Sequence, residues 1–235
     1  MSDAATEVRE FRIDIPEGEI IDLKSRLAST RWPDAETPDD WSQGLPLEYH
    51  QEFCKYWETE YDWYKTQEKL NKFPQFKSRF DGIDIHFVHV RSKENNARPL
   101  IITHGWPGSI VEFQKVIAPL TDPVGHGGKP EDAFHVVCPS LPGFGFSDKP
   151  TGTGWGVIKI AEVWNQLMLR LGYDRYFAQG GDWGSAVTTM IGLQNLGNCK
   201  GLHVNMPSSP PTKEALNNPN DKDKKAFAAG QFYQQ

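Results

Sequence analysis

The chain has little cysteine, and what it has suggests neither a disulfide framework nor a metal site. Its 235 residues contain only Cys54, Cys138 and Cys199, which lie far apart and form no CxxC pair. An odd, scattered set is typical of reduced thiols, so we expect a reducing compartment, with the cytoplasm as the default. No ligand-spaced set of His, Cys and Asp occurs, and no GxGxxG follows an expected strand. The sequence therefore indicates neither a metal nor an organic cofactor.

Long apolar runs and an excess of positive charge are also missing. No stretch approaches the roughly 18 apolar residues that a membrane-spanning helix requires. The opening residues, MSDAATE, have neither the basic nor the apolar part of a secretory leader. Lys and Arg number 25 against 31 Asp and Glu, a formal net charge of −6. This balance argues against nucleic acid or an anionic membrane as partner, and favours a small, largely uncharged molecule. A homo-oligomer is compatible with the sequence.

Aromatic residues, by contrast, are plentiful, and many fall in a first zone, residues 1–74. Ile20, Leu23 and Leu27 follow the spacing of one buried helical face, and Pro33 ends that helix. A second helical stretch is expected over about residues 47–70, with aromatic side chains that we interpret as packing surface: Phe53, Tyr56, Trp57 and Trp63. We predict that this zone is a helical N-terminal extension.

The second zone, residues 75–206, alternates strands and helices. Gln75–Phe80 and Ile83–Val90 flank Asp81-Gly82, a strong hairpin signal. Further strands are expected at 100–103, 134–138, 176–179 and 202–205, with helices near 109–120, 158–171 and 184–196. A hairpin followed by β-α-β units predicts an α/β sheet with helices on both faces. The sheet would end in an exposed edge after 202–205. Residues 207–235, rich in Pro, Asn, Lys and Asp, are expected to be poorly ordered.

The segment GGDWG, residues 180–184, follows a buried strand and opens a helix. This is the context of a nucleophile elbow, in which glycines let strand and helix approach around a strained turn that carries the nucleophile. Asp182 occupies the nucleophile position. The alternative is that Asp182 is simply the N-cap of the next helix, a common role for Asp.

A second segment, HGWPG at residues 104–108, follows an earlier strand and precedes a helix. In α/β-hydrolases such a loop supplies one N–H of the oxyanion hole, and the residue after the nucleophile supplies the other. Those donors would be the backbone amides of Trp106 and Trp183. An ordinary strand-to-helix turn is the alternative, but two such motifs in the correct order are harder to obtain by chance.

Together these segments resemble the microsomal-type epoxide hydrolases, which have a helical extension before an α/β-hydrolase core. The resemblance covers about residues 10–206. It is carried by FKSRFDGIDIHFVH at 76–89, HGWPGS at 104–109, PGFGFS at 142–147, GDWGS at 181–185 and, more loosely, residues 13–34. It implies an N-terminal hairpin, a parallel sheet with helices on both faces, and a detoxifying conversion of epoxides to vicinal diols.

The chemistry that the resemblance implies suits an aspartate. With an ordinary pKa of about 3.9, Asp182 is already anionic at neutral pH, whereas a serine would first need a base. It would open a strained epoxide to give an ester, and water would then attack the ester carbonyl while the Trp106 and Trp183 amides stabilise the oxyanion. The two indole rings would also line a pocket for an apolar epoxide.

Two other functions stay open. Haloalkane dehalogenases use the same elbow aspartate, but their pattern has a halide-binding Asn where this chain has Trp106, which favours epoxides. A non-catalytic binding module is the second alternative. In the family the catalytic residues come in the order nucleophile, acid, histidine, and no histidine of this chain fits that order. After Asp182 the only histidine is His203, within an expected strand, and the only tyrosine is Tyr233.

The chain therefore resembles a family member that stops at the start of its lid, residues 207–235, with the C-terminal part of the fold missing. We expect at most one slow alkylation of Asp182 from such a chain, and little or no turnover.

Overall fold

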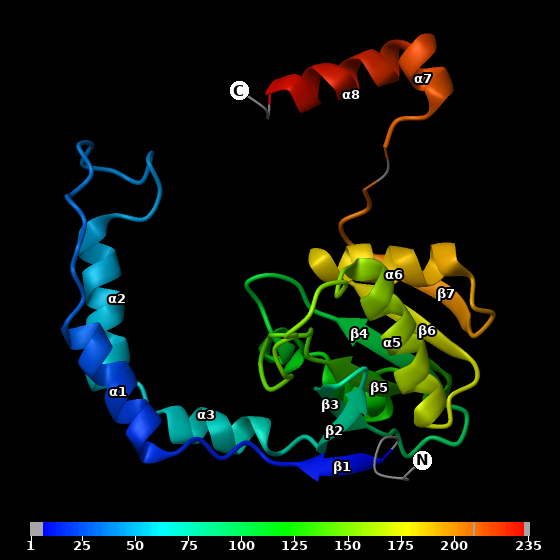
Figure 1. Cartoon of the computed structure of the whole chain (residues 1–235), viewed down its shortest axis with the longest axis horizontal. Helices are drawn as coiled ribbons and strands as arrows, with labels where there is room; N and C mark the ends of the chain where they lie inside the picture. Colours follow the sequence, from blue (N-terminus) through cyan, green and yellow to red (C-terminus); the bar gives the residue numbers. More distant parts are fainter. Residues whose placement is uncertain (1–6, 209, 233–235) are drawn as a thin grey trace.

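A seven-stranded sheet forms the centre of the computed structural model, which describes residues 7–208 and 210–232 (Figure 1). The strands are β1 (Val8–Phe11), β2 (Gln75–Phe80), β3 (Ile83–Val90), β4 (Arg98–Thr103), β5 (Phe134–Pro139), β6 (Tyr176–Gly180) and β7 (Cys199–Val204). Their order across the sheet is β1-β2-β3-β5-β4-β6-β7. The first four in this order pair antiparallel, and β5, β4, β6 and β7 run parallel. The predicted α/β architecture is confirmed.

The predicted hairpin lies between β2 and β3. Asp81 and Gly82 both have positive φ, at 46° and 89°. That pair of conformations belongs to the two-residue type I′ turn, whose twist matches that of the strands it joins. The turn sets the register of β2 against β3, because the residues on its two sides, Phe80 and Ile83, pair with each other.

Helices cover both faces of the sheet. On one face lie α5 (Val157–Arg170) and α6 (Trp183–Gln194), where the fully buried Trp164 and Leu167 pack into a cluster with Phe87 and Ile101. On the other face, the short helices η2 (Ile110–Phe113) and α4 (Ile117–Thr121) pack against Val136 and its neighbours. Two further 3-10 turns, η3 (Val124–His126) and η4 (Pro130–Asp132), lead into β5.

The continuous helix expected over 109–120 is wrong, because the chain breaks between η2 and α4. Pro119 explains the break. In one long helix its ring would clash with the carbonyl of Lys115 and would remove a hydrogen bond. As the third residue of a new helix, Pro119 lies where a backbone N–H would have no intrahelical acceptor, so its missing N–H costs no hydrogen bond. The sequence pattern was apolar enough for a helix, but the proline divides it.

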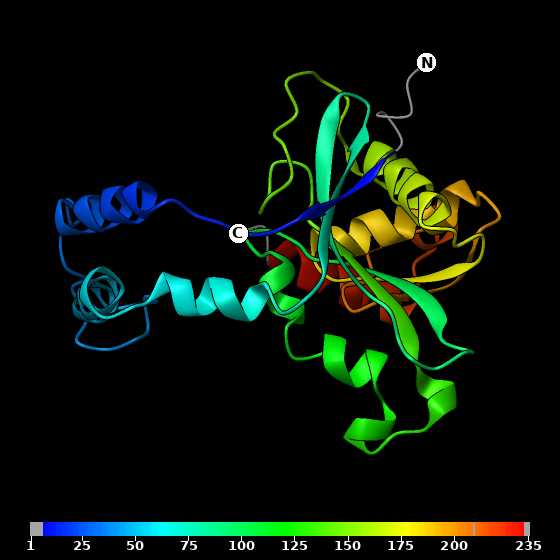
Figure 2. The same ribbon diagram turned by 90° about the horizontal axis from the view of Figure 1, so that it is seen from below.

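The N-terminal zone is not wholly helical, which corrects the prediction for residues 1–74. β1 joins the sheet through antiparallel pairs that run from Val8 with Ser78 to Phe11 with Gln75. α1 (Glu17–Ala28) follows and packs against α2 (Leu47–Thr59). In both views of the ribbon, this helical arm extends away from the sheet (Figures 1 and 2).

The single helix expected over 47–70 is also wrong, since α2 ends at Thr59 and α3 (Trp63–Leu70) begins separately. Asp62 is the N-cap of α3, and its carboxylate accepts hydrogen bonds from the backbone N–H groups of Tyr64 and Lys65. An N-cap of this kind satisfies donors that a helix start leaves free, so Asp62 favours a new helix at this point.

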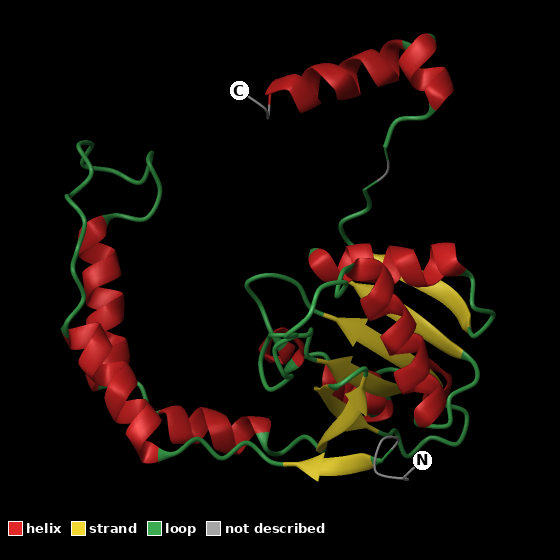
Figure 3. Cartoon of the chain, in the orientation of Figure 1, coloured by secondary structure: helices red, strands yellow, loops and turns green. Residues whose placement is uncertain are grey.

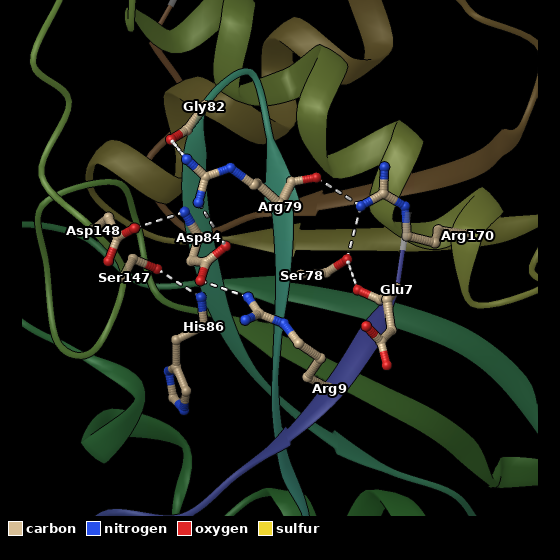
Figure 4. Close-up of polar contacts among 10 residues, drawn as sticks. All are labelled: Glu7, Arg9, Ser78, Arg79, Gly82, Asp84, His86, Ser147, Asp148 and Arg170. Carbon is tan, nitrogen blue, oxygen red and sulfur yellow. Dashed lines mark hydrogen bonds and ion pairs between the residues drawn. The ribbon is translucent and has the colours of Figure 1, made fainter. Parts of the chain in front are cut away.

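Polar contacts anchor β1 to the hairpin (Figure 4). Arg9 forms an ion pair with Asp84 of β3. The hydroxyl of Ser78 donates to the carbonyl of Glu7 at 2.8 Å, and Arg170 of α5 donates to the same hydroxyl at 2.7 Å. The first strand is therefore tied to residues that lie about seventy positions later in the sequence.

The loop after β5, residues 140–148, is anchored beside the same hairpin (Figure 4). The backbone N–H of Asp84 donates to the Asp148 carboxylate, and that of His86 donates to the Ser147 hydroxyl, each at 2.9 Å. Ser147 in turn donates to the carbonyl of Ser140 at 2.8 Å. The backbone N–H of Ser140 also donates to the carbonyl of His86 at 2.8 Å, so both ends of this loop are held next to β3.

At the other side of the sheet, β7 is an edge strand, as expected. An open apolar groove beside it is lined by Leu100, Ile102, Phe113, Phe177 and Leu202. The segment expected to be poorly ordered contains two helices, α7 (Lys213–Asn217) and α8 (Asp221–Phe232), which stand apart from the sheet (Figure 3). Across the described residues, none of the helices combines the length and apolar character needed to cross a bilayer.

Candidate active site

The turn from β6 into α6 is tight and strained. Asp182 has φ 50° and ψ −127°, a conformation that costs a non-glycine residue about 1–3 kcal/mol. A side chain at Gly180 would overlap the carbonyl of Gly184, and one at Gly184 would overlap the carbonyl of Thr103 in β4. These two glycines let the strand, the helix and the neighbouring strand approach closely.

The side chain of Asp182 does not cap the helix that it precedes. Its carbonyl accepts the N–H of Ser185 at 2.9 Å and that of Ala186 at 3.4 Å, as the carbonyl before a helix should, but its carboxylate makes no capping hydrogen bond. Instead, the backbone N–H of Trp106 donates to Oδ1 of Asp182 at 2.7 Å. The carboxylate is therefore directed at the loop after β4, contrary to the N-cap interpretation.

Electrostatics keep this carboxylate ionised. The backbone amide of Trp183, and then that of Trp106, lower the pKa of Asp182 below its ordinary value, against a smaller opposing effect of burial. The residue is exposed to solvent. An ionised, accessible carboxylate beside two main-chain donors can act as a nucleophile and can then place negative charge against those donors.

The HGWPG loop brings Gly105 against the carboxylate. A side chain at Gly105 would overlap Oδ1 and Cβ of Asp182. Trp106 and Trp183, whose backbone amides lie beside the Asp182 carboxylate, are exposed residues, at 66% and 56%. The apolar pocket that we expected them to line stays a prediction.

His104 is the site residue that the sequence analysis missed, since it counted this histidine only as part of a loop. It is 1% exposed. Its Nε2 lies 3.1 Å from the backbone nitrogen of Leu141, and its Nδ1 lies 2.9 Å from the carbonyl oxygen of Gly105. No periodicity or spacing marks it, because both partners are main-chain groups that any residue could supply.

The histidines other than His104 belong to elements other than the two loops that form this turn. His203 is an exposed residue of β7, and the prediction that it lies within a strand is confirmed. His86 is buried in β3, and His89 contacts the hydroxyl of Tyr173. The remaining histidines besides His104 are His50 in α2, His126 in η3 and His135 in β5. In the part of the chain that the structure describes, none of them hydrogen-bonds to Asp182.

No metal site is apparent at this turn. Among the described residues, no group of three or more His, Cys, Asp or Glu side chains is arranged to hold a metal ion.

Two family descriptions match the chain. The family described as epoxide hydrolase N terminus matches residues 8–113, and the family described as alpha/beta hydrolase fold matches residues 98–233. The two matches meet at β4, so the arm and hairpin fall in the first and the elbow in the second.

Named relatives agree with these matches. A Stigmatella aurantiaca protein, provisionally named an epoxide hydrolase, is 50% identical over 96% of this chain and 51% of its own length. Epoxide hydrolase 1 of Sus scrofa is 39% identical over 85% of this chain and 45% of its own length. The chain thus spans about half the length of the curated relatives it matches.

Among solved structures, the Aspergillus niger epoxide hydrolase is similar with a TM-score of 0.81 and 31% identity. The match covers 99% of this chain and 61% of that one. The juvenile hormone epoxide hydrolase of the silkworm Bombyx mori has a TM-score of 0.76 and 33% identity, over 85% of this chain and 53% of that one.

Proposed function

The chain belongs to the α/β-hydrolase fold family and, within it, to the epoxide hydrolases of the microsomal type, and we propose that Asp182 is the nucleophile of an epoxide hydrolase reaction. One observation carries the proposal. An exposed carboxylate, presented by a strained turn, accepts the backbone N–H of Trp106 at 2.7 Å instead of capping its own helix.

In the first step, Oδ2 of Asp182 attacks an epoxide carbon. The ring C–O bond breaks, its electron pair stays on the leaving oxygen, and that oxygen takes a proton from an acid or from solvent. The product is a hydroxyalkyl ester of Asp182. Oδ1, which the Trp106 amide holds, becomes the carbonyl oxygen of that ester. The lowered pKa of Asp182 supports this step, because it keeps the attacking group ionised.

In the second step, water attacks the ester carbonyl carbon and gives up a proton to a base. Negative charge develops on Oδ1, where the amides of Trp106 and Trp183 would stabilise it. The intermediate collapses as the ester C–O bond breaks, the leaving oxygen takes up the proton held by the base, and the vicinal diol departs from a restored Asp182 carboxylate. The only histidine after Asp182 is His203, which is exposed in β7, so we expect residues 1–235 to accumulate the ester.

The substrate class follows from the residues around Asp182. Trp106 and Trp183 offer apolar surface, which supports a small epoxide with an aryl or alkyl substituent, as in a detoxifying enzyme. Trp106 occupies the position of the halide-binding Asn of dehalogenases, which argues against that alternative. The free cysteines support a reducing compartment such as the cytoplasm.

The test is to incubate the 235-residue chain with styrene oxide and measure intact mass and diol. A single adduct, with diol not exceeding one equivalent, agrees with the proposal. Halide release from a haloalkane would point to the dehalogenase alternative. A folded chain with neither adduct nor product would point to the binding module.

A further inference from the structure

A buried histidine lies directly behind the amide that contacts Asp182. Nδ1 of His104 is 2.9 Å from the carbonyl oxygen of Gly105. That carbonyl and the N–H of Trp106 belong to one peptide group, and the N–H lies 2.7 Å from Oδ1 of Asp182. The imidazole and the carboxylate thus contact opposite ends of the same peptide.

The hydrogen bonds of His104 determine its tautomer. The backbone N–H of Leu141 can only donate, so Nε2, at 3.1 Å, must be the unprotonated nitrogen that accepts it. The proton of a neutral ring therefore sits on Nδ1, which donates to Gly105. In a doubly protonated ring, the N–H at Nε2 would face the N–H of Leu141, with no acceptor between them.

The surroundings also favour the neutral ring. Burial lowers the pKa of His104, against the weaker opposing effects of the Gly105 carbonyl and the charge of Glu112. The ring of Phe144 packs edge-to-face against the imidazole, with centroids 5.6 Å apart.

We propose that His104 is a positioning residue, which orients and polarises the Gly105–Trp106 peptide so that its N–H meets the oxyanion of Asp182. The inference rests on the proposed function only in that an oxyanion develops on Asp182; the contact of His104 with this peptide does not depend on it. Hydrogen bonds that run in series through a peptide group polarise one another, so donation to the Gly105 carbonyl makes the Trp106 N–H a stronger donor.

This arrangement also connects the elbow to a third loop. Leu141 is the second residue of the 140–148 loop, which Ser147 and Asp148 bind to β3. The position of the Trp106 amide therefore depends on the loops that follow β4 and β5, in addition to the elbow that follows β6. A phenylalanine at position 104 would keep the packing but would leave the Leu141 N–H and the Gly105 carbonyl without their partner.

The first test needs no variant and no substrate. Long-range ¹H–¹⁵N NMR on the ¹⁵N-histidine-labelled 235-residue chain reports the tautomer of each ring. We expect His104 to carry its proton on Nδ1 from pH 8 to pH 6. A proton on Nε2, or an imidazolium in that range, would overturn the inference whether or not the chain reacts with epoxides.

The second test compares His104→Phe with His126→Phe, an exposed control. Each folded variant is first esterified with styrene oxide, and the ester is then cleaved with hydroxylamine. The hydroxylamine nitrogen attacks the ester carbonyl carbon, the ester C–O bond breaks, and the diol leaves with a proton, so that a hydroxamate remains on Asp182.

Negative charge again develops on Oδ1 in this cleavage. Because hydroxylamine attacks without help from a protein base, the cleavage rate depends on how well the Trp106 amide stabilises that charge. Loss of a whole oxyanion donor lowers the reaction rate about a hundredfold or more. We therefore expect the weakened Trp106 donor in His104→Phe to slow cleavage about tenfold. We expect no change in His126→Phe. Equal rates in both variants would overturn the inference. Absence of any ester in the parent chain would refute the proposed function and leave the tautomer result to judge the role of His104.

Discussion

Trp106 and Asp182 meet through one hydrogen bond although 76 residues separate them in the chain. The contact forms because β4 and β6 are parallel neighbours, with Thr103 paired to Gly180 at their ends. Parallel strands deliver their following loops to the same edge of the sheet, so the HGWPG loop and the elbow emerge side by side.

The close approach of Gly105 to Asp182 makes this glycine sensitive to substitution. In Gly105→Ala the new methyl group overlaps the carboxylate, which must turn away from the Trp106 amide. We expect at least a tenfold slower formation of the styrene oxide adduct, followed by intact mass, because a displaced reacting group loses its orientation. Gly152→Ala is the matched control, since nothing lies within 4 Å of its added carbon. An unchanged rate in Gly105→Ala would show that the carboxylate does not need this orientation.

The lowered pKa of Asp182 predicts how its reaction depends on pH. The carboxylate stays ionised down to a pH below the ordinary aspartate pKa, because the Trp183 and Trp106 amides stabilise its charge. The alkylation rate should therefore be flat from pH 8 to pH 5 and should fall only at more acid pH. A rate that falls between pH 7 and pH 5 would indicate that a histidine, and not Asp182, controls the step.

Buried His86 predicts acid sensitivity of the fold. Burial first, and then the charge of Lys77, lower its pKa from 6.5 to about 3 in the folded chain. The unfolded chain binds the proton more readily, so stability is fully present above pH 6.5 and is lost as the pH falls from 6.5 toward 3. Within this range His86 should contribute about 1.4 kcal/mol per pH unit to the slope of the free energy of unfolding against pH.

Urea unfolding at several pH values measures this slope. His89, with its pKa lowered to about 4, adds a similar contribution over part of the same range. His86→Gln should flatten the slope, whereas His126→Gln, an exposed control, should not. Equal slopes in the parent and in His86→Gln would contradict the assignment.

The anchor of β1 predicts a local effect on hydrogen exchange. Arg9→Ala removes the ion pair with Asp84, which is partly exposed and worth up to about 1 kcal/mol. We expect faster amide exchange in residues 8–11 and unchanged exchange in β4. Exchange that rises across the whole sheet, or nowhere, would show that this contact does not hold β1.

Local chemistry made much of the core predictable. Asp81-Gly82 specifies its hairpin by turn preference alone, and the elbow glycines mark a close approach that only a backbone without side chains permits. β1 was missed because its partner, β2, lies about seventy residues later, and a four-residue edge strand has no pattern of its own. His104 was missed for a related reason, since the main-chain partner of its Nε2 comes from a loop that only the folded sheet brings near.

The proposed reaction of Asp182 requires a covalent bond between its carboxylate and the substrate. Peptide mapping by tandem mass spectrometry, after one equivalent of styrene oxide, locates that bond directly. We predict the mass of the intact epoxide on Asp182, and no such adduct in Asp182→Asn. An adduct confined to another residue, or one that persists unchanged in Asp182→Asn, would contradict the account.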